Sequence, residues 1–600
     1  MIGENALQHP DLVERMQKEG HEIGSHTFTH SDIGTMSPLQ MRMELNANQR
    51  LFQAITGQSM TLFRPPYVAE TELNTRSELL PLLQAQEMGY TMVGQSVDSS
   101  DWQGLSSEEI VNQVLNQLSN GNVILLYDSG GDRSNTVKAL PMIIEELKKR
   151  GYTFTTVAGL IGKSESQIMP PANPDNPYLV YDKAVFKVLQ GWQSGLTFLF
   201  YSAILLGILR LAVFIFLSRK QVKSYKETKI DPNFTPFVSV VIAAYNEEKV
   251  IGKTIDSILS SDYSNLEILI IDDGSTDDTA VVVQENYDHH PLVRFIQKTN
   301  GGKSSAVNLG FKEAKGEIVV ALDADTLIAE NAISLLVHHF KNEHVAAVSG
   351  NVKVGNKGNL LTNWQHIEYV TGFNLERRAF AALNCITVVP GAIGAWRKTA
   401  VEEAGFFKED TLAEDTDLTL TLLRNGKKIE FEEKAYAYTE VPEDVKGLAK
   451  QRYRWIYGTL QCLWKHREAL FDKKHHSLGF IALPNMWLFQ YFYQIISPIA
   501  DLLFIIALFS PTPGKAAIGF ILFYLLDFFA SLYAFRLEKE SPKPLLSLFL
   551  QRILYKQLMT YVVIKSIISA IMGVTVGWNK LKRNGNVTQE NPMSKVKENM

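Results

Sequence analysis

The chain has 600 residues, more than one hydrophobic core can organise, so at least two globular units are expected. Charged residues make up 20% of the chain, the net charge is −5 and no long basic run is present, which excludes nucleic acid as a partner. The two cysteines, Cys385 and Cys462, are too few for a disulfide framework or a cysteine-based zinc site. The first residues, MIGENALQHP, lack the basic and apolar segments of a signal peptide, so none is expected.

Near the start of the chain, the segment SHTFTH places His26 and His30 four residues apart, as in half of a metal site. His26 follows His21 by five residues, so the segment is not the H-E-x-x-H pattern of a zinc protease. Two imidazoles are fewer ligands than a typical zinc site has. The segment therefore predicts a metal-binding pair that needs further ligands from elsewhere.

A Pro- and Asn-rich stretch, MPPANPDNPY, has the composition of a linker, and we expect a linker over residues 163–195. The apolar run that follows predicts a transmembrane helix over residues 196–218, interrupted only by Arg210. A basic segment, SRKQVKSYKETK, comes directly after this run. It predicts that the next part of the chain is cytoplasmic.

The central part of the chain repeats one pattern three times. The segments FVSVVIAAYNEE, LEILIIDDGSTDDT and GEIVVALDADT each combine an apolar, β-branched run with a polar or acidic end. Helical patterns lie between them, and this alternation predicts a parallel sheet with helices on both faces. Ligands of such sheets bind at the carboxyl ends of the strands, and these ends are acidic here.

The third of these strands ends in the sequence DAD. Alternate residues of an extended strand share a face, so Asp323 and Asp325 can point at one ligand. Two hard oxygen ligands with open positions suit Mg²⁺ or Mn²⁺ holding a diphosphate. Such a metal would offset the charge that builds on a leaving nucleoside diphosphate.

Another acidic group, AEDTDL, precedes the helical run LTLTLLRNG and contains Glu414, Asp415 and Asp417. Acidic residues are favoured at a helix N-terminus by the helix dipole, which is one explanation of the group. The other explanation is catalytic, with Asp415 as a general base that deprotonates an acceptor hydroxyl.

The segment QRYRW places Gln451, Arg454 and Trp455 on one face of a predicted helix. Arginine can bind phosphate oxygens with both arms of its guanidinium, and tryptophan can stack on a sugar ring. An amphipathic helix at a membrane surface is the alternative, because an apolar region follows.

The last third of the chain is strongly apolar. We expect an interfacial plus transmembrane helix over 478–510, a transmembrane helix over 516–536, an interfacial helix over 543–557 and a transmembrane helix over 558–577. An odd number of these spans would place the C-terminus outside, whereas the basic segment GWNKLKR prefers the cytoplasm. The number of spans and the side of the C-terminus therefore stay open.

The order AYNEE, DDGSTD, DAD, ED and QRYRW, flanked by apolar runs, resembles an inverting family-2 glycosyltransferase over residues 236–470. The branch is similar to the processive membrane synthases of chitin oligosaccharides, hyaluronan, cellulose and poly-N-acetylglucosamine. The resemblance implies an α/β GT-A (Rossmann-like) domain with transmembrane helices, Asp415 as the base, and Asp323 and Asp325 as ligands of Mg²⁺ or Mn²⁺. It implies substrate binding by Ala244, Tyr245, Glu247, Asp273, Lys303, Gly391, Ala392, Glu414, Gln451, Arg454 and Trp455.

The N-terminal segments RPPY, DSSDW and VILLYDSGG, together with the histidine pair, resemble polysaccharide deacetylases related to chitooligosaccharide deacetylase. The resemblance implies an incomplete (β/α) barrel over residues 1–162, with His26 and His30 as ligands of Zn²⁺ or another divalent metal. Two departures imply a truncated domain without hydrolase activity. The family's TFDDG strand would lie before Met1, and Tyr127 stands where the family has a histidine, although a tyrosine with a pKa of about 10 poorly replaces an imidazole.

The sequence thus predicts a membrane-bound enzyme that transfers N-acetylglucosamine from UDP-GlcNAc to a growing β-linked polysaccharide and exports it. Its expected partners are the UDP-sugar donor, the polysaccharide acceptor and the lipid bilayer, and protein partners stay open. We expect a multi-pass protein of the plasma membrane, with the glycosyltransferase domain cytoplasmic and the deacetylase-like domain extracytoplasmic.

Four alternatives accompany this prediction. The first is a bifunctional deacetylase and synthase, and the second is a hyaluronan- or cellulose-type synthase that uses another UDP-sugar. The third, a single transfer to a polyprenyl lipid, is disfavoured by QRYRW, and the fourth, a non-catalytic scaffold, is disfavoured by the intact acidic motifs. Linkage, chain length and oligomeric state stay open, as does whether Met1 is the native start.

Overall fold

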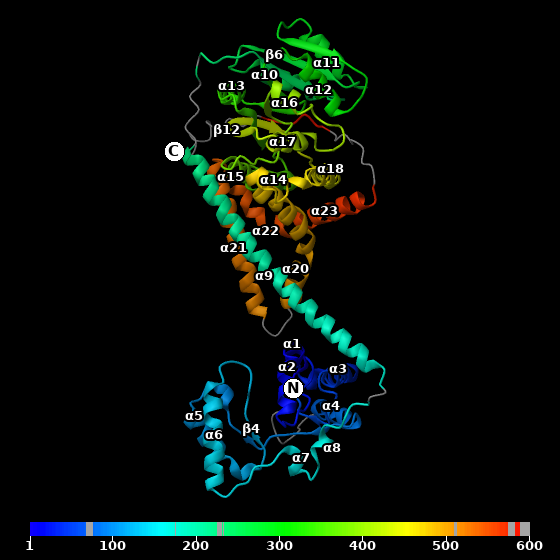
Figure 1. The fold of residues 1–600 in the computed structure, drawn as a ribbon, viewed down its shortest axis with the longest axis vertical. Coiled ribbons are helices and arrows are strands. Elements are labelled where there is room, and N and C mark those ends of the chain that lie inside the picture. The colour runs from blue at the N-terminus through cyan, green and yellow to red at the C-terminus, as the bar shows by residue number, and fades with distance from the viewer. Residues whose placement is uncertain are drawn as a thin grey trace. The chain divides into compact units, whose positions relative to one another are not determined.

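The computed structural model describes residues 1–67, 76–173, 176–224, 231, 233–508, 513–573 and 583–588 of the chain. These residues form two compact units, Met1–Tyr201 and Ser202–Met600 (Figure 1). Each unit has its own hydrophobic core. The expectation of at least two globular units is therefore confirmed.

The first unit surrounds two short pairs of parallel strands with helices. Strand β1 (Leu62–Phe63) pairs with β2 (Thr91–Met92), and β3 (Val97–Asp98) pairs with β4 (Ile124–Leu125). Parallel pairing of strands that are separated by helices is the pattern of a (β/α) domain. The helices are α1 (Gly3–Gln8), α2 (Pro10–Lys18), α3 (Pro38–Thr56), α4 (Arg76–Glu87), α5 (Ser107–Asn116), α6 (Ser134–Lys149), α7 (Val157–Leu160) and α8 (Glu165–Ile168).

The structure differs from the linker expected over residues 163–195. Ile168 and Met169 are buried in the core of the first unit, and Arg50 forms an ion pair with Asp182. A long helix, α9 (Tyr178–Ser224), begins within the expected linker. The apolar residues next to the first prolines are buried, although the composition of the stretch resembles that of a linker.

The second unit contains a sheet with the order β7-β6-β5-β8-β11-β10-β12-β9. The first four strands of this order are parallel, and β11 runs antiparallel to both of its neighbours. Strand β10 is parallel to β12, and β9 is antiparallel to β12. The strands are β5 (Val238–Ala244), β6 (Leu266–Asp272), β7 (Val293–Gln297), β8 (Ile318–Asp323), β9 (Thr326–Ile328), β10 (Val345–Val354), β11 (Gly394–Arg397) and β12 (Lys428–Thr439).

Alternation along the strands explains how helices cover both faces of this sheet. Val241 and Leu269 pack with helix α12 (Lys303–Glu313) on one face. Their neighbours, Val240 and Ile268, pack with α10 (Ile251–Leu259) on the other face. Successive side chains of a strand point to opposite faces, so an uninterrupted apolar run serves both cores. The predicted α/β architecture is confirmed.

The strand register aligns the three acidic or polar strand ends. Ala244 is opposite Asp272 in the β5–β6 pair, and Ala243 is opposite Asp323 in the β5–β8 pair. The carboxyl ends of β5, β6 and β8 therefore meet at one edge of the sheet, as predicted. The other helices of this region are α11 (Thr279–Tyr287), α13 (Ala332–His338), α14 (Leu360–Glu368), α15 (Leu375–Ala381), α16 (Lys398–Glu403), α17 (Glu414–Arg424) and α18 (Val445–Lys465).

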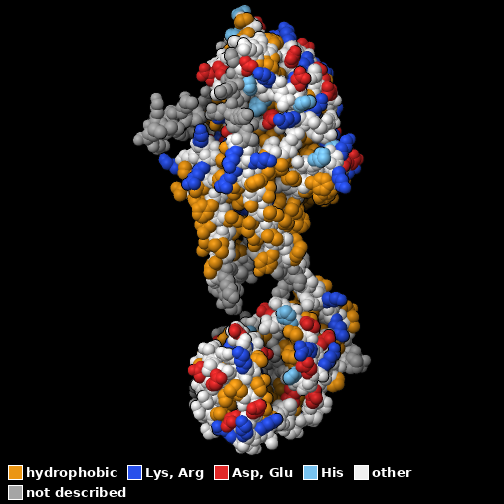
Figure 2. Space-filling model, turned by 60° about the vertical axis from the view of Figure 1, so that its left-hand side comes forward, with side chains coloured by type: hydrophobic (Ala, Val, Ile, Leu, Met, Phe, Trp, Pro, Cys, Tyr) orange, Lys and Arg blue, Asp and Glu red, His pale blue; other side chains and the backbone are white. Residues whose placement is uncertain are grey.

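Apolar helices follow α18. They are α19 (Leu483–Asn485), α20 (Tyr493–Leu508), α21 (Pro513–Leu537), α22 (Leu548–Leu550) and α23 (Lys556–Ile571), with π-helical turns at Leu478–Ala482, Met486–Phe492 and Gln551–Tyr555. Helices α20 and α21 run side by side away from the sheet (Figure 1). Figure 2 shows a broad hydrophobic surface in this region, which includes exposed Leu205 and Leu209 of α9 and Ile518 and Leu522 of α21.

Two helical segments of the described residues are long and apolar enough to cross a membrane, Tyr201–Lys223 and Ala517–Leu537. They match the spans predicted over 196–218 and 516–536. The other two predicted spans are not among them, because α20 and α23 contain 16 residues each. Residues 509–510 and 574–577 of those two predictions lie outside the described residues.

Candidate active site

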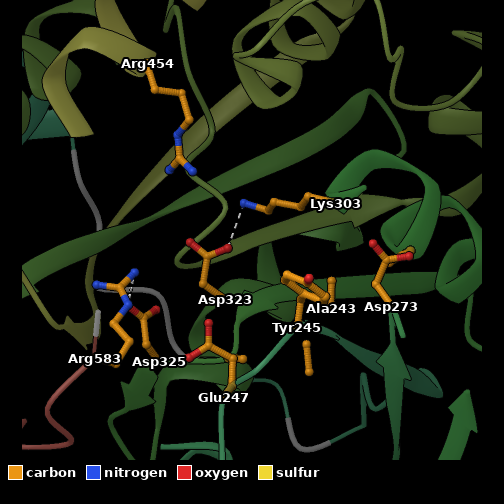
Figure 3. A pocket seen from close by; sticks show the side chains of 12 residues that line it. Ala243, Tyr245, Glu247, Asp273, Lys303, Asp323, Asp325, Arg454 and Arg583 are labelled. Carbon is orange, nitrogen blue, oxygen red and sulfur yellow. Dashed lines mark ion pairs between the residues drawn. The ribbon is translucent and has the colours of Figure 1, made fainter. Parts of the chain in front are cut away.

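A polar pocket lies at the carboxyl ends of β5, β6 and β8 (Figure 3). Most of its side chains come from the strand ends and from the start of α12. Arg454 of α18 and Arg583, which lies far along the chain, complete it. Its lining residues are Ala243, Ala244, Tyr245, Glu247, Asp273, Lys303, Ala306, Asp323, Ala324, Asp325, Arg454 and Arg583.

Asp273, just beyond β6, holds the loop that precedes α12. Its buried carboxylate accepts hydrogen bonds from the backbone N–H groups of Gly301 and Gly302, at 2.9 and 2.7 Å, and from Lys298 Nζ at 2.6 Å. Gly302 has a φ of 88°, a conformation that glycine adopts without strain. The loop therefore turns tightly and places Lys303 at the first position of α12.

Lys303 is the cationic centre of the pocket. Its Nζ lies 2.7 Å from Asp323 Oδ1 and 3.3 Å from Glu414 Oε1. Burial disfavours the charged ammonium, but the carboxylates of Asp323, Glu414 and Asp415 outweigh burial and raise the pKa of Lys303. This lysine therefore stays protonated and connects the end of β8 with the start of α17.

The two aspartates of the DAD segment have different environments. Burial disfavours ionisation of Asp323, but the adjacent Lys303 lowers its pKa overall. Burial raises the pKa of Asp325, and Arg583 opposes this rise. Arg583 Nη2 lies 2.6 Å from Asp325 Oδ2, and a dashed line marks this ion pair in Figure 3. Each carboxylate thus has one basic partner.

The C-terminal segment Arg583–Thr588 brings this arginine into the pocket. Glu440, directly after β12, accepts hydrogen bonds from the backbone N–H groups of Asn584 and Gly585, at 2.7 and 3.0 Å. Val587 is buried against Leu327 and Tyr438. The segment is thus anchored on both sides of the turn that carries Asp325.

Asp415 lies in the first turn of α17, next to Glu414, which pairs with Lys303. It accepts hydrogen bonds from the backbone N–H groups of Thr416 and Gly391, at 2.7 and 3.3 Å. Burial, reinforced by the neighbouring Glu414, raises the pKa of Asp415 to about 6. A carboxylate with a pKa near neutrality suits a general base.

Asp417, two residues further along α17, has a structural role. It is fully buried and pairs with His466 Nε2 at 2.9 Å and with Lys465 Nζ at 3.0 Å. These partners lie at the end of α18, so Asp417 fastens α17 to α18. The acidic group AEDTDL thus combines a pocket residue with a packing residue.

Residues 235–458 match the family described as glycosyltransferase-like family 2. The chain contains a family 2 glycosyltransferase domain. Residues 1–93 match the polysaccharide deacetylase family, so a deacetylase-like domain precedes it. Both families agree with the resemblances found in the sequence.

Named relatives match parts of the chain. A poly-beta-1,6-N-acetyl-D-glucosamine synthase of Staphylococcus epidermidis is 32% identical over 260 residues, which are 43% of this chain and 63% of the relative. The chain thus covers less than two thirds of this relative's length. Among solved structures, the mannosyltransferase PcManGT from Pyrobaculum calidifontis, in complex with GDP-Man and Mn²⁺, is similar at 22% identity and a TM-score of 0.48 over 64% of this chain and 98% of its own. The Bc1960 peptidoglycan N-acetylglucosamine deacetylase is 32% identical, with a TM-score of 0.25, over 27% of this chain and 74% of its own.

The structure of the glycosyltransferase domain brings most of the predicted site residues together. The predicted residues that line the pocket are Ala244, Tyr245, Glu247, Asp273, Lys303, Asp323, Asp325 and Arg454. Glu414, Asp415 and Gly391 adjoin it through Lys303, because a Cβ atom at Gly391 would lie 2.6 Å from Lys303 Nζ. The side chain of Ala392 is buried in the hydrophobic core.

The residues of the QRYRW segment have two kinds of environment, since one lines the pocket and the others pack around it. Arg454 lines the pocket. Gln451 is buried and accepts a hydrogen bond from Arg452 Nη1 at 2.9 Å. Trp455 packs against the guanidinium of Arg452 at 4.2 Å and against the ring of Phe373 at 6.2 Å. Gln451 and Trp455 therefore contribute to the packing of α18 and do not line the pocket.

Arg583 is the charged pocket residue that the sequence did not predict, and three alanines of the lining, Ala243, Ala306 and Ala324, were not predicted either. Arg583 belongs to the polar segment RNGNVT, which has neither a strand nor a helix period. The preceding residues, KLK, made the segment resemble a basic flank of a membrane helix. The sequence feature that could have indicated Arg583 is a basic residue after the last apolar run, followed by the turn-forming pair Asn-Gly.

In the deacetylase-like domain, the rings of His26 and His30 meet edge to face with centroids 4.8 Å apart. His26 Nδ1 donates to the carbonyl oxygen of Arg64 at 2.7 Å, which leaves Nε2 with a free lone pair. Burial lowers the pKa of His26 to about 4, so its ring is neutral near pH 7. Within the described ranges, no group of three His, Cys, Asp or Glu residues could hold a metal ion.

Proposed function

We propose that the protein is an inverting glycosyltransferase that adds N-acetylglucosamine from UDP-GlcNAc to a β-linked polysaccharide. The observation that supports this proposal is the set of acidic groups around Lys303. Its Nζ pairs with Asp323 of the DAD segment and with Glu414, the neighbour of the candidate base Asp415. The similarity to the poly-beta-1,6-N-acetyl-D-glucosamine synthase supports the choice of donor sugar.

The residues at the end of β8 fit a divalent cation. Asp323 and Asp325 supply hard oxygen donors, which Mg²⁺ and Mn²⁺ prefer, and their carboxylates line the same pocket. When bound, the cation would neutralise charge on the departing diphosphate. Lys303 and Arg454 supply further positive charge on the same side of the pocket.

Asp415 is the base of the proposed reaction. Its carboxylate accepts the proton of the acceptor hydroxyl as that oxygen attacks the anomeric carbon of the donor. Attack comes from the side opposite the diphosphate, so an α-linked donor gives a β-linked product. Lys303 pairs with Asp323 and with Glu414, and burial together with Glu414 raises the pKa of Asp415 to about 6.

We also propose that the protein is embedded in a membrane as a multi-pass protein. The apolar segments Tyr201–Lys223 and Ala517–Leu537, with the hydrophobic surface of Figure 2, support this location. Exposed Arg219, Lys220 and Lys223 at the end of the first segment favour a cytoplasmic glycosyltransferase domain and an extracytoplasmic deacetylase-like domain. Helices beside the active site would give the growing polysaccharide a route outward.

For the deacetylase-like domain, we propose no hydrolytic role in this chain. Tyr127 lies at the position where the family has a histidine, and burial, followed by Asp98, raises its pKa. A phenol that holds its proton this tightly is a poor general acid. Retained binding of Zn²⁺ or another divalent metal by the histidine pair is tested directly by the metal content of the purified protein.

The experiment for the main proposal uses membranes that contain the full chain. Labelled UDP-GlcNAc, UDP-glucose and UDP-glucuronate are supplied separately with Mn²⁺ or Mg²⁺. A long product from UDP-GlcNAc that a β-N-acetylhexosaminidase degrades supports the proposal. A long product from another UDP-sugar alone would overturn the choice of donor, and full activity of Asp415→Asn would overturn the choice of base.

A further inference from the structure

Three consecutive charged residues of α15 have different environments. Glu376 pairs with Arg210 Nη2 at 3.3 Å and accepts a hydrogen bond from Asn485 Nδ2 at 3.2 Å. Arg378 pairs with Glu538 at 2.8 Å and also with Glu433. Both side chains thus fix α15 to neighbouring elements.

Arg377, between these two residues, has no such partner. It is only 8% exposed, and neither its Nε nor its Nη1 has a hydrogen-bond partner among the described residues. Burial lowers the pKa of its guanidinium to about 10. Buried arginines are normally paired, so an arginine of this kind points to a ligand that supplies the missing acceptors.

Asn374, one turn before Arg377, shows the same property. Its side chain is completely buried, and both its Oδ1 and its Nδ2 lack partners among the described residues. Residues three apart on a helix lie on one side, so the two orphaned groups adjoin each other. Together they present hydrogen-bond donors and one amide acceptor.

Of these two residues, Arg377 lies within electrostatic reach of the proposed base. Asp415 is among the charges that act on Arg377, together with Tyr369 and Glu376. Asn374 ends the π-helical turn Tyr369–Asn374, and the aromatic rings of that turn continue to Trp455 through Phe373. Turns of this kind recur at functional sites, because they displace side chains from the regular helical ladder.

We propose that Asn374 and Arg377 bind the acceptor end of the polysaccharide and select an N-acetylated amino sugar there. The carboxamide of Asn374 can exchange two hydrogen bonds with an acetamido group, donating to its carbonyl oxygen and accepting from its N–H. Arg377 donates to hydroxyl oxygens and accepts nothing, so it fits the oxygen-rich face of a neutral sugar. Phe373, the residue before Asn374, packs against Trp455 and supplies an aromatic surface next to these polar groups.

This inference rests on the proposed function, because it assigns the acceptor of that reaction. It differs from the donor site described above, since neither Asn374 nor Arg377 lines the pocket that holds the DAD carboxylates. Donor binding and acceptor binding can therefore be measured separately.

The decisive variants are Asn374→Leu and Arg377→Met, which keep side-chain size and remove the orphaned polar groups. If these groups exist for a ligand, their removal leaves the melting temperature unchanged or raises it. The KM for an added chitotetraose acceptor rises at least tenfold, while the Kd for UDP-GlcNAc stays within twofold. In the unaltered protein, acceptors with free amino groups in place of acetamido groups have a higher KM than chitotetraose. In Asn374→Leu, the two kinds of acceptor have a similar KM.

A lower melting temperature in both variants, or an acceptor KM within twofold of the unaltered protein, would overturn the inference. Arg378→Met is the matched control, because it removes the buried ion pairs with Glu538 and Glu433 and is expected to lower the melting temperature. Arg467→Met replaces an exposed arginine and controls for the general effect of an Arg-to-Met substitution. If membranes with the unaltered protein make no polymer from UDP-GlcNAc, the proposed function has failed instead.

Discussion

Arg583 and Asp325 form an ion pair of 2.6 Å that joins the C-terminal segment to the carboxyl end of the sheet. The segment is anchored independently of this pair, since Lys253 Nζ donates to the carbonyl oxygen of Gly585 at 2.6 Å and Val587 is buried. An arginine therefore neutralises one of the two carboxylates that we assign to the cation. The cation and Arg583 act on the same charge.

Replacement of Arg583 by glutamine is expected to strengthen Mn²⁺ binding in the absence of nucleotide. An adjacent cation weakens a carboxylate metal site, so removal of the guanidinium should lower the Kd for Mn²⁺ by about tenfold. Electron paramagnetic resonance of free Mn²⁺ measures this Kd directly. Val587→Asp should have a similar effect, because it undocks the same segment.

An unchanged Kd for Mn²⁺ in both Arg583→Gln and Val587→Asp would contradict this competition. Exposed Arg467→Gln serves as the control for loss of one positive charge elsewhere on the domain. In an Asp325→Asn background, Arg583→Gln should no longer change the Kd for Mn²⁺, because the carboxylate on which both cations act is absent.

The rate of transfer should depend on the ionisation of Asp415. Its pKa is raised to about 6, so the basic form predominates above that pH and is lost below it. We expect the acceptor-saturated rate to fall about tenfold per pH unit below 6 and to level off above it. A pH–rate profile with saturating donor tests this expectation, and a flat profile between pH 5 and 8 would speak against Asp415 as the base.

Replacement of Lys303 by methionine should move this profile to higher pH. Lys303 lowers the pKa of Asp415, so its loss lets burial and Glu414 raise that pKa further, by about one unit. The same variant should weaken donor binding, because the pocket loses its central cation. A profile midpoint that stays in place would show that the two side chains do not interact across the site.

Gly391→Ala should reduce activity with little effect on folding. The added Cβ would lie 2.6 Å from Lys303 Nζ and 3.2 Å from Asp323 Oδ1, which displaces the lysine from its carboxylates. We expect at least a tenfold loss of transfer, since small misplacements of reacting groups are costly. Gly358→Ala is the matched control, because nothing lies within 4 Å of its Cβ position. Equal activity of the two variants would contradict the prediction.

The sequence by itself determined the α/β fold of the glycosyltransferase domain, the acidic ends of its strands and the two long apolar helices. These features follow from local patterns: apolar runs of strand length, helical periodicity between them and uninterrupted hydrophobicity. The family resemblance then pointed to Asp323, Asp325, Lys303 and Arg454, and the structure places all four in one pocket.

Other features were decided only by the tertiary structure. The strand register brought Ala244, Asp272 and Asp323 to one edge, and packing against α18 turned Asp417 into a buried anchor. The insertion of Arg583 depends on contacts with residues more than 140 positions away. Such contacts leave no periodic trace in the sequence, because each residue of the segment is bound individually by carboxylates and by the edge of the sheet.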